Sequence, residues 1–450
     1  MYSILFGKRL VALYVCVPVM LLFSIIGSKS YATESLPPLT LERAAQRLVQ
    51  QHPQLQVLDW RLKAATEQLQ VAALNPGYEL ALGAENLLGT GELSGVKSLE
   101  LSVALSSVLE LGNKRQTRTA TASAEQALLL AQRQANSLDL LGELTQRFIS
   151  VLTLQQKLQL ASEAVAISEQ ALQLVGQRVQ GGGAPEAELL RARVAVRQAQ
   201  LQQGLLQAEL ASGKLALASL WGAQHADFSV VSGDLFQLTD STDFQLLYQR
   251  VLTTPQLEVF AATARLQQAQ LAQLHSQSVA DVSWQLGVMR SQENRDFAVV
   301  AGVSVPLFSQ SRNQVAVKVA LAENEAQRIT QQDELLQLRA RLYQAWQMHR
   351  YSTMAVRDLQ REILPLLQQA LTQTEDAYLR GRYSYTDWLS ARQALQEAQL
   401  QLLDAASTAL SNQALLEQLT GLPLAASANT NHSFPQPFSS AATSAAGSLP

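Results

Sequence analysis

Residues 99–115 read LELSVALSSVLELGNKR and join a strand pattern to the start of a very long helix. From Leu99 to Leu105, apolar side chains alternate with small or polar ones, which predicts a strand with one apolar face. From Asn113 to Gln180 the chain has no proline, and about 68 residues rising ~1.5 Å each make a helix on the order of 100 Å long. Because no single globular core is that wide, we expect this helix to pack against other helices.

The long helix carries apolar residues at spacings of three, four and seven, which is typical of a coiled-coil seam. These residues are Leu141, Leu144, Phe148, Val151, Leu158, Val165, Leu172, Val175 and Val179. The glycines Gly181, Gly182 and Gly183 then interrupt the helix, and Pro185 favours a new helix start. The sequence therefore predicts a helical hairpin over about residues 113–221.

The second half of the chain repeats the first. Residues 53–57 read PQLQV and residues 255–259 read PQLEV, while the halves close on LASLWG at 217–222 and LEQLTG at 416–421. Such a duplication predicts two similar structural units, over 33–227 and 244–422, joined by a connector at 228–243. The second helical hairpin is expected over about 311–420.

Two residues distinguish the second hairpin from the first. His349 interrupts its apolar seam, and we favour a histidine held at a helix interface over a ligand-binding one. Pro365 lies inside the helical pattern and predicts a kink, because proline lacks a backbone donor and crowds the preceding turn. The two hairpins should therefore differ.

Four strands are expected, over about 77–86, 98–108, 281–290 and 296–306. Each is about nine to eleven residues long, enough to cross a bilayer when tilted, and each has one apolar face. The lipid-facing candidates are Tyr78, Leu80, Leu82, Leu101, Val103, Trp284, Leu286, Phe297 and Val299. The alternative is an ordinary half-buried sheet. In lipid, however, four strands leave open edges that must pair, so several chains would have to contribute, and three would supply about twelve strands.

The first residues of the sequence predict a targeting segment, and the last residues predict a disordered tail. Lys8 and Arg9 precede an apolar run and the small residues up to Ala32, so residues 1–32 are expected to be a cleaved signal peptide. An uncleaved membrane anchor is the alternative. Cys16, the only cysteine, follows residues that do not favour lipidation. Residues 423–450 are rich in serine, alanine, asparagine and proline and are expected to be a disordered tail.

Composition and motifs argue against an enzyme. The net charge of −3 gives no reason to expect nucleic acid as a partner. The five histidines are scattered without metal-ligand spacing, and the glycines at 181–183 lack the lysine of a phosphate loop. We therefore expect no catalytic residue, metal site or cofactor.

The order of elements resembles the TolC family of outer-membrane efflux channels over about residues 39–422. Glu110 to Arg115 is similar to the Glu-Leu-Gly-Gly-Lys-Arg run of the branch that serves cobalt-zinc-cadmium resistance pumps, with Asn113 in place of the second glycine. Residues 305–308, VPLF, match the family pattern after the last strand.

This resemblance implies a mainly α-helical homotrimer without catalytic activity. A twelve-stranded β-barrel would lie in the outer membrane, and a long α-helical barrel would extend into the periplasm. The implied partners are outer-membrane lipid, a periplasmic adaptor (membrane fusion protein) and an inner-membrane proton-driven pump of the RND type. The implied cargo is heavy-metal cations.

The resemblance also implies that the hairpin turns contact the adaptor and close the channel. Asp387 and Glu188 are then gate candidates, because three copies of a carboxylate near an axis attract cations and repel one another. Ser390 stands where some family members have a second aspartate. Both acids also fit ordinary first-turn helix positions. The adaptor-contact candidates are Gly181, Gly182, Gly183, Arg380, Gly381, Arg382 and Tyr383.

Two alternative functions stay open. A TolC-like channel for drug efflux or type I protein secretion would share the whole architecture. A periplasmic coiled-coil adaptor or scaffold would have long hairpins but would not need four strands of membrane-spanning length.

Overall fold

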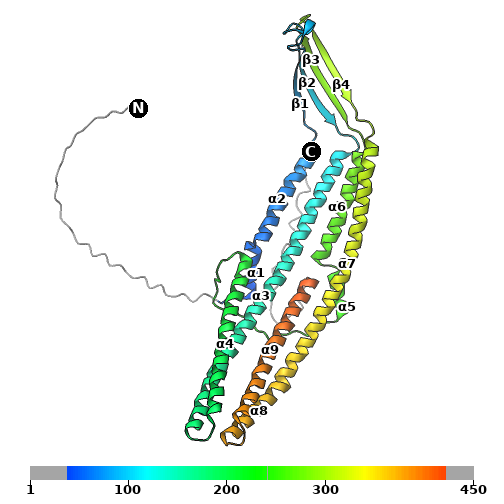
Figure 1. The fold of residues 1–450 in the computed structure, drawn as a ribbon. Helices are drawn as coiled ribbons and strands as arrows, with labels where there is room; N and C mark the ends of the chain where they lie inside the picture. The colour runs from blue at the N-terminus through cyan, green and yellow to red at the C-terminus, as the bar shows by residue number, and fades with distance from the viewer. Residues whose placement is uncertain (1–37, 241, 422–450) are drawn as a thin grey trace, which may run out of the picture. The chain divides into compact units, whose positions relative to one another are not determined.

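The computed structural model describes residues 38–240 and 242–421 (Figure 1). The expected signal peptide and C-terminal tail lie outside these residues. The first half contains α1 (Leu41–Gln51), α2 (Pro53–Ala73), β1 (Glu79–Glu85), β2 (Glu100–Leu109), α3 (Lys114–Gln180) and α4 (Glu186–Ala218). The second contains α5 (Phe244–Val251), α6 (Pro255–Gln277), β3 (Val282–Ser291), β4 (Phe297–Ser304), α7 (Ser309–Asp358), α8 (Leu364–Leu379) and α9 (Tyr385–Thr420). Short 3-10 turns lie at Gly91–Leu93 and Ser219–Trp221.

The helices lie side by side, with the sheet beyond one end of α3 and the hairpin turns at its other end (Figure 1). Near the sheet, α2 packs on α3, α3 on α6, and α6 on α7. Toward the turns, α3 packs on α4 and α9, and α9 packs on α7 and α8. The 67 residues of α3 run through both layers, so this helix connects the sheet to the turns.

The four strands form one antiparallel sheet in the order β1-β2-β3-β4. The register places Leu82, Val103, Val288 and Val299 in one row across the sheet. Since successive residues point to opposite faces, this register puts the apolar residues of all four strands on the same face. The outer edges of β1 and β4 have no strand partner in the described chain.

The largest buried cluster lies around the middle of α3 and includes Leu144, Phe148, Val151, Leu217 and Trp221. The connector crosses this region. The side-chain amide of Gln155 accepts from Val231 N at 2.8 Å and donates to Val231 O at 3.0 Å. One side chain thus satisfies both backbone groups of a residue that would otherwise need a strand partner.

The second hairpin departs from regular helix where Pro365 predicted it. Residues Leu359–Ile363 form a π-helical turn directly before α8, and the first hairpin has no such turn. Proline removes one backbone donor, and a wider turn is a common way for a helix to absorb that loss.

His349 lies at the contact of α7 with α9 and the connector, with 1% of its surface exposed. Its Nδ1 lies 3.0 Å from Ala409 O and its Nε2 lies 3.1 Å from Thr239 O. The two ring nitrogens thus contact backbone carbonyls of two different segments, α9 and the connector. This side chain is therefore a structural bridge.

Within the described ranges, none of the helices is both long enough and apolar enough to cross a membrane.

We predict that His349→Leu destabilises the protein by about 1–3 kcal/mol for each carbonyl left without a donor. His275→Leu is the matched control, because His275 is exposed on α6. Thermal unfolding of the detergent-solubilised protein measures the difference. Equal melting temperatures for the two variants would show that the bridge does not stabilise the fold.

Candidate functional site

The apolar face of the sheet is the first candidate site. Leu82 and Val299 are 76% and 73% exposed, and the register puts Leu80, Leu101, Val103, Trp284, Leu286 and Phe297 on the same face. Tyr78 precedes β1, and its ring contacts Trp284 with 6.3 Å between centroids. A folded chain does not leave such a face in water without a function, because large exposed apolar patches mark contact with lipid or another protein.

Aromatic side chains lie at both ends of this face. Tyr78 and Trp284 mark the end near the helices, and Phe297 marks the far end, with the Arg290 guanidinium 5.6 Å from the centre of its ring. Six residues of β3 separate the two levels, which is about 20 Å of strand. An apolar band of about 25 Å between aromatic girdles is typical of strands in an outer membrane.

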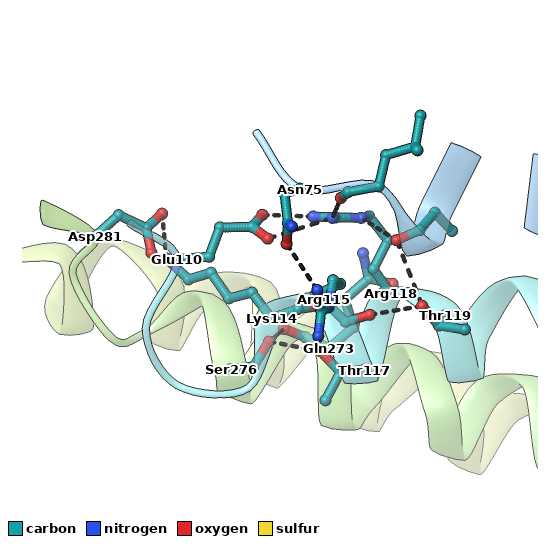
Figure 2. A network of polar contacts seen from close by, with 12 residues as sticks. Asn75, Glu110, Lys114, Arg115, Thr117, Arg118, Thr119, Gln273, Ser276 and Asp281 are labelled. Atoms are coloured by element: carbon teal, nitrogen blue, oxygen red, sulfur yellow. Dashed lines mark hydrogen bonds and ion pairs between the residues drawn. The ribbon is translucent and has the colours of Figure 1, made fainter. Parts of the chain in front are cut away.

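The junction between the sheet and the helices is a network of charged side chains (Figure 2). Glu110, directly after β2, pairs with Arg118 on α3 at 2.5 Å. The Arg118 guanidinium also donates to the carbonyls of Ala72 and Leu74, both at 2.9 Å. One arginine therefore holds β2, α3 and the end of α2 together.

A second ion pair joins the two repeats at the same junction (Figure 2). Lys114 Nζ lies 2.7 Å from Asp281, which precedes β3, and Leu111 N donates to the same carboxylate at 3.0 Å. Asn113 starts α3 in the left-handed conformation with φ of 60°. Asparagine is among the few residues that adopt this conformation readily, which explains how it replaces a glycine here.

The hairpin turns are the second candidate site. Gly182 and Gly381 have φ of 73° and 71°, a region that favours glycine, so each turn depends on one of the predicted glycines. Gly181 and Gly183 lie on either side of Gly182 within the first turn. Arg178 reaches across from α3 to the second turn, where its guanidinium donates to Tyr378 O. The two turns are therefore bonded to each other.

Three aromatic side chains pack beside these turns. Tyr378, Tyr385 and Trp388 are almost fully buried, with ring centroids 5.1 to 6.2 Å apart, and they pack on Val175 of α3. The Arg178 guanidinium lies 4.3 Å from the centre of the Tyr378 ring. The aromatic cluster and the arginine thus hold the second hairpin against the first.

Glu188 is part of this contact. The Tyr378 hydroxyl donates to the Glu188 carboxylate at 3.2 Å. Burial, with the charge of Glu188 adding to it, raises the pKa of Tyr378 to about 12, so this phenol keeps its proton at neutral pH. The acid predicted from the first repeat therefore bonds to the second hairpin.

Asp387 has a local partner instead. Its carboxylate accepts from Ser384 Oγ at 2.7 Å and from Ser384 N at 2.9 Å, which completes a capping box at the start of α9. These bonds lower the pKa of Asp387, with the Ser384 hydroxyl as the main cause. The cap is therefore complete above the ordinary value of 3.8 and is lost only as the pH falls through the lowered pKa.

The other predicted turn residues do not join the aromatic cluster. Arg380 pairs with Asp376 at 3.4 Å on the surface, Arg382 is exposed, and Tyr383 is 54% exposed. Four residues of this contact were not predicted from the sequence: Arg178, Tyr378, Tyr385 and Trp388. The aromatic residues at 378, 385 and 388 were the available signal.

Across residues 38–240 and 242–421, no three His, Cys, Asp or Glu side chains gather as a metal site would require.

Known proteins share this architecture. Residues 44–223 match the family of outer membrane efflux proteins. The cobalt-zinc-cadmium resistance protein CzcC of Cupriavidus metallidurans is 26% identical over 375 residues, which are 83% of this chain and 88% of that protein. The fold is similar to crystal structures of CusC (TM-score 0.72, 16% identity, 85% of this chain and 92% of that one) and of VceC from Vibrio cholerae (TM-score 0.68, 18% identity, 85% and 96%).

We predict that Lys114→Asp and Asp281→Lys each destabilise the protein by about 1–3 kcal/mol, since each leaves a partly buried charge beside a like charge. The double variant Lys114→Asp, Asp281→Lys should regain most of the loss. Arg380→Asp is the control, because the exposed pair Arg380–Asp376 should contribute about 1 kcal/mol or less. Thermal unfolding in detergent checks all four, and a double variant as unstable as the sum of its parts would contradict the ion pair.

Proposed function

We propose that this chain, which belongs to the outer membrane efflux protein family, conducts heavy-metal cations out of the periplasm. It is the outer-membrane channel of a tripartite efflux system, extends into the periplasm and is not an enzyme. TolC-family channels are trimers that act with an adaptor and an inner-membrane pump. For this chain we propose a homotrimer, a membrane fusion protein as the adaptor and an RND-type proton-driven pump.

One observation supports the trimer most strongly: the sheet and the helical layer end at the same two margins. β1 continues from α2, and β4 continues into α7, so each margin consists of one open strand edge and one outer helix. In lipid, the backbone N–H and C=O groups of an open strand edge need hydrogen-bond partners. β4 of one copy can supply these partners to β1 of the next copy.

The outer helices of both margins carry exposed apolar residues. On α2 these are Val57, Trp60 and Val71, which are 49%, 69% and 65% exposed. On α7 they are Val315, Val319 and Ile329, which are 66%, 51% and 56% exposed and follow a heptad spacing. Contact between two different margins is head-to-tail, and such contacts form a ring when the rotation closes. Three copies would close a barrel of about twelve strands.

The relative CzcC, whose name states cobalt-zinc-cadmium resistance, supports heavy metals as the cargo. A channel that conducts ions passively must bind them only weakly, so it needs no closed metal site. The polar or small residues on the second face of the sheet, such as Ser102, Gln285 and Ser304, suit a water-filled interior.

We propose that the hairpin turns close the periplasmic end. Arg178, Tyr378 and Glu188 bond the first hairpin to the second, and opening would require these contacts to separate. The glycine turns and the exposed Arg380, Arg382 and Tyr383 surround this contact and are the surface offered to the adaptor.

We predict that Asp387→Ala combined with Glu188→Ala raises the conductance of the channel in planar bilayers. Loss of the Glu188 carboxylate frees Tyr378, and loss of the Asp387 cap loosens the start of α9. Glu186→Ala is the control, because Glu186 is an exposed first-turn acid of α4 that lies outside the aromatic cluster. Unchanged conductance and cation selectivity in the double variant would remove both acids from the gate.

We predict that deletion of the gene lowers bacterial growth on graded cobalt, zinc and cadmium, and that a plasmid copy restores it. Copper, silver and a panel of drugs, tested in parallel, define the cargo. Drug sensitivity with unchanged metal tolerance would assign drug efflux instead. Unaltered tolerance to every metal would overturn the heavy-metal proposal.

A further inference from the structure

A cluster of aromatic side chains lies on the surface where α5 meets α7, and we call it the aromatic patch. It consists of Phe244, Tyr248, Tyr343 and Trp346. The Phe244 ring lies 5.2 Å from Tyr343 in an edge-to-face contact and 5.7 Å from Trp346. The Arg339 and Arg350 guanidinium groups lie 5.2 and 5.0 Å from the ring centres of Tyr248 and Trp346.

The aromatic patch is open on its outer side. Tyr343 is 48% exposed, and the neighbouring Leu336 is 67% exposed. A hollow of about 470 Å³ lies here, lined by Phe244, Gln245, Leu336, Arg339, Ala340 and Tyr343. Only 6% of the chain is aromatic, yet Phe244 and Tyr343 line this hollow, and Tyr248 and Trp346 pack beside them. An exposed apolar surface of this kind is typical of a binding site.

The described chain ends beside the aromatic patch. Leu416 and Leu419, in the last turns of α9, are buried together with Leu247 of α5 and Leu342 of α7. Phe244, Tyr248 and Trp346 pack against this same cluster. The chain therefore leaves α9 at Gly421 next to the helices that carry the aromatic patch.

The sequence beyond Gly421 contains one segment that suits such a surface. Residues 422–450 include no Asp, Glu, Lys or Arg, and their only aromatic residues are Phe434 and Phe438 in the segment SFPQPF at 433–438. Pro435 and Pro437 favour an extended polyproline II backbone, which loses little entropy when it binds. Grooves lined by aromatic side chains are the usual receptors of such segments.

We propose that residues 433–438 dock on the aromatic patch of their own chain, with a phenylalanine ring in the hollow. The tether is long enough, since about 13 residues between Gly421 and Phe434 span up to about 45 Å when extended. A short tether also holds the segment at an effective concentration in the millimolar range, so weak contacts suffice. The arginines over the outer rings disfavour a cationic occupant, whereas an uncharged segment meets no repulsion.

Docking would secure the end of α9 to α5 and α7. Leu416 and Leu419, in the last turns of α9, are buried with Leu247 of α5, and a segment that returns to the patch would add a second attachment there. The tail expected to be disordered would then be ordered over six residues and would stabilise the second repeat.

Disulfide cross-linking of the full-length protein tests the proposal, because the chain without residues 1–32 has no cysteine. Gln245→Cys with Ser433→Cys should form a disulfide within one subunit on mild oxidation. Gln245→Cys with Ser448→Cys is the matched control, and we expect its yield to be several-fold lower. A yield for Ser433→Cys no higher than that of the control overturns the proposal, and a band of two subunits instead shows that a neighbouring copy supplies the segment.

A second measurement tests the aromatic contact itself. Phe434→Ala with Phe438→Ala should reduce the cross-linked yield to that of the control pair. The same change should lower the apparent Tm. Adding Leu336→Ala should lower the Tm no further than the larger of the two separate effects, because the effects of substitutions at contacting residues are not additive. Fully additive losses, or an unchanged yield, would overturn docking at this hollow.

Discussion

The open hydrogen-bonding edges of β1 and β4 are the constraint on which the rest of the structure depends. In water such edges can be solvated, but in hydrocarbon each unpaired N–H and C=O costs several kcal/mol. The apolar face of the sheet requires hydrocarbon, and the edges then require further strands. Both demands are met together when copies of the chain pair edge to edge, and the exposed apolar residues of α2 and α7 lie at the same margins.

The two repeats each contribute one helical hairpin, but the two hairpins differ in structure near their turns. Three glycines form the turn of the first hairpin. The second hairpin has a π-helical turn before Pro365 and three buried aromatic residues. Arg178 comes from the first repeat and bonds to Tyr378 of the second. The junction with the sheet follows the same principle, because Lys114 of the first repeat pairs with Asp281 of the second. Contacts between the repeats therefore add to those within the first repeat at both ends of α3.

The two acids predicted at the turns have different physical roles. Asp387 forms a capping box with Ser384, a role set by residues three positions apart in the sequence. Glu188 receives the Tyr378 hydroxyl from the other hairpin, 190 residues away. The family resemblance implies that both acids belong to one gate, but of the two acids Glu188 is the one that bonds to the other hairpin. The capping role of Asp387 could be read from the sequence, since Ser384 and Asp387 have the spacing of a capping box.

The sequence by itself determined the helices, the four strands, the two turns and the face of each strand that is apolar. These features depend on side-chain period and on proline and glycine, which act over a few neighbouring residues. Only the tertiary structure decided that Arg178, Tyr378 and Trp388 form one cluster, that His349 bridges two carbonyls, and that an aromatic hollow lies beside the end of α9. These contacts join residues far apart along the chain, and the register and rotation of long helices that bring them together follow from packing over their whole length.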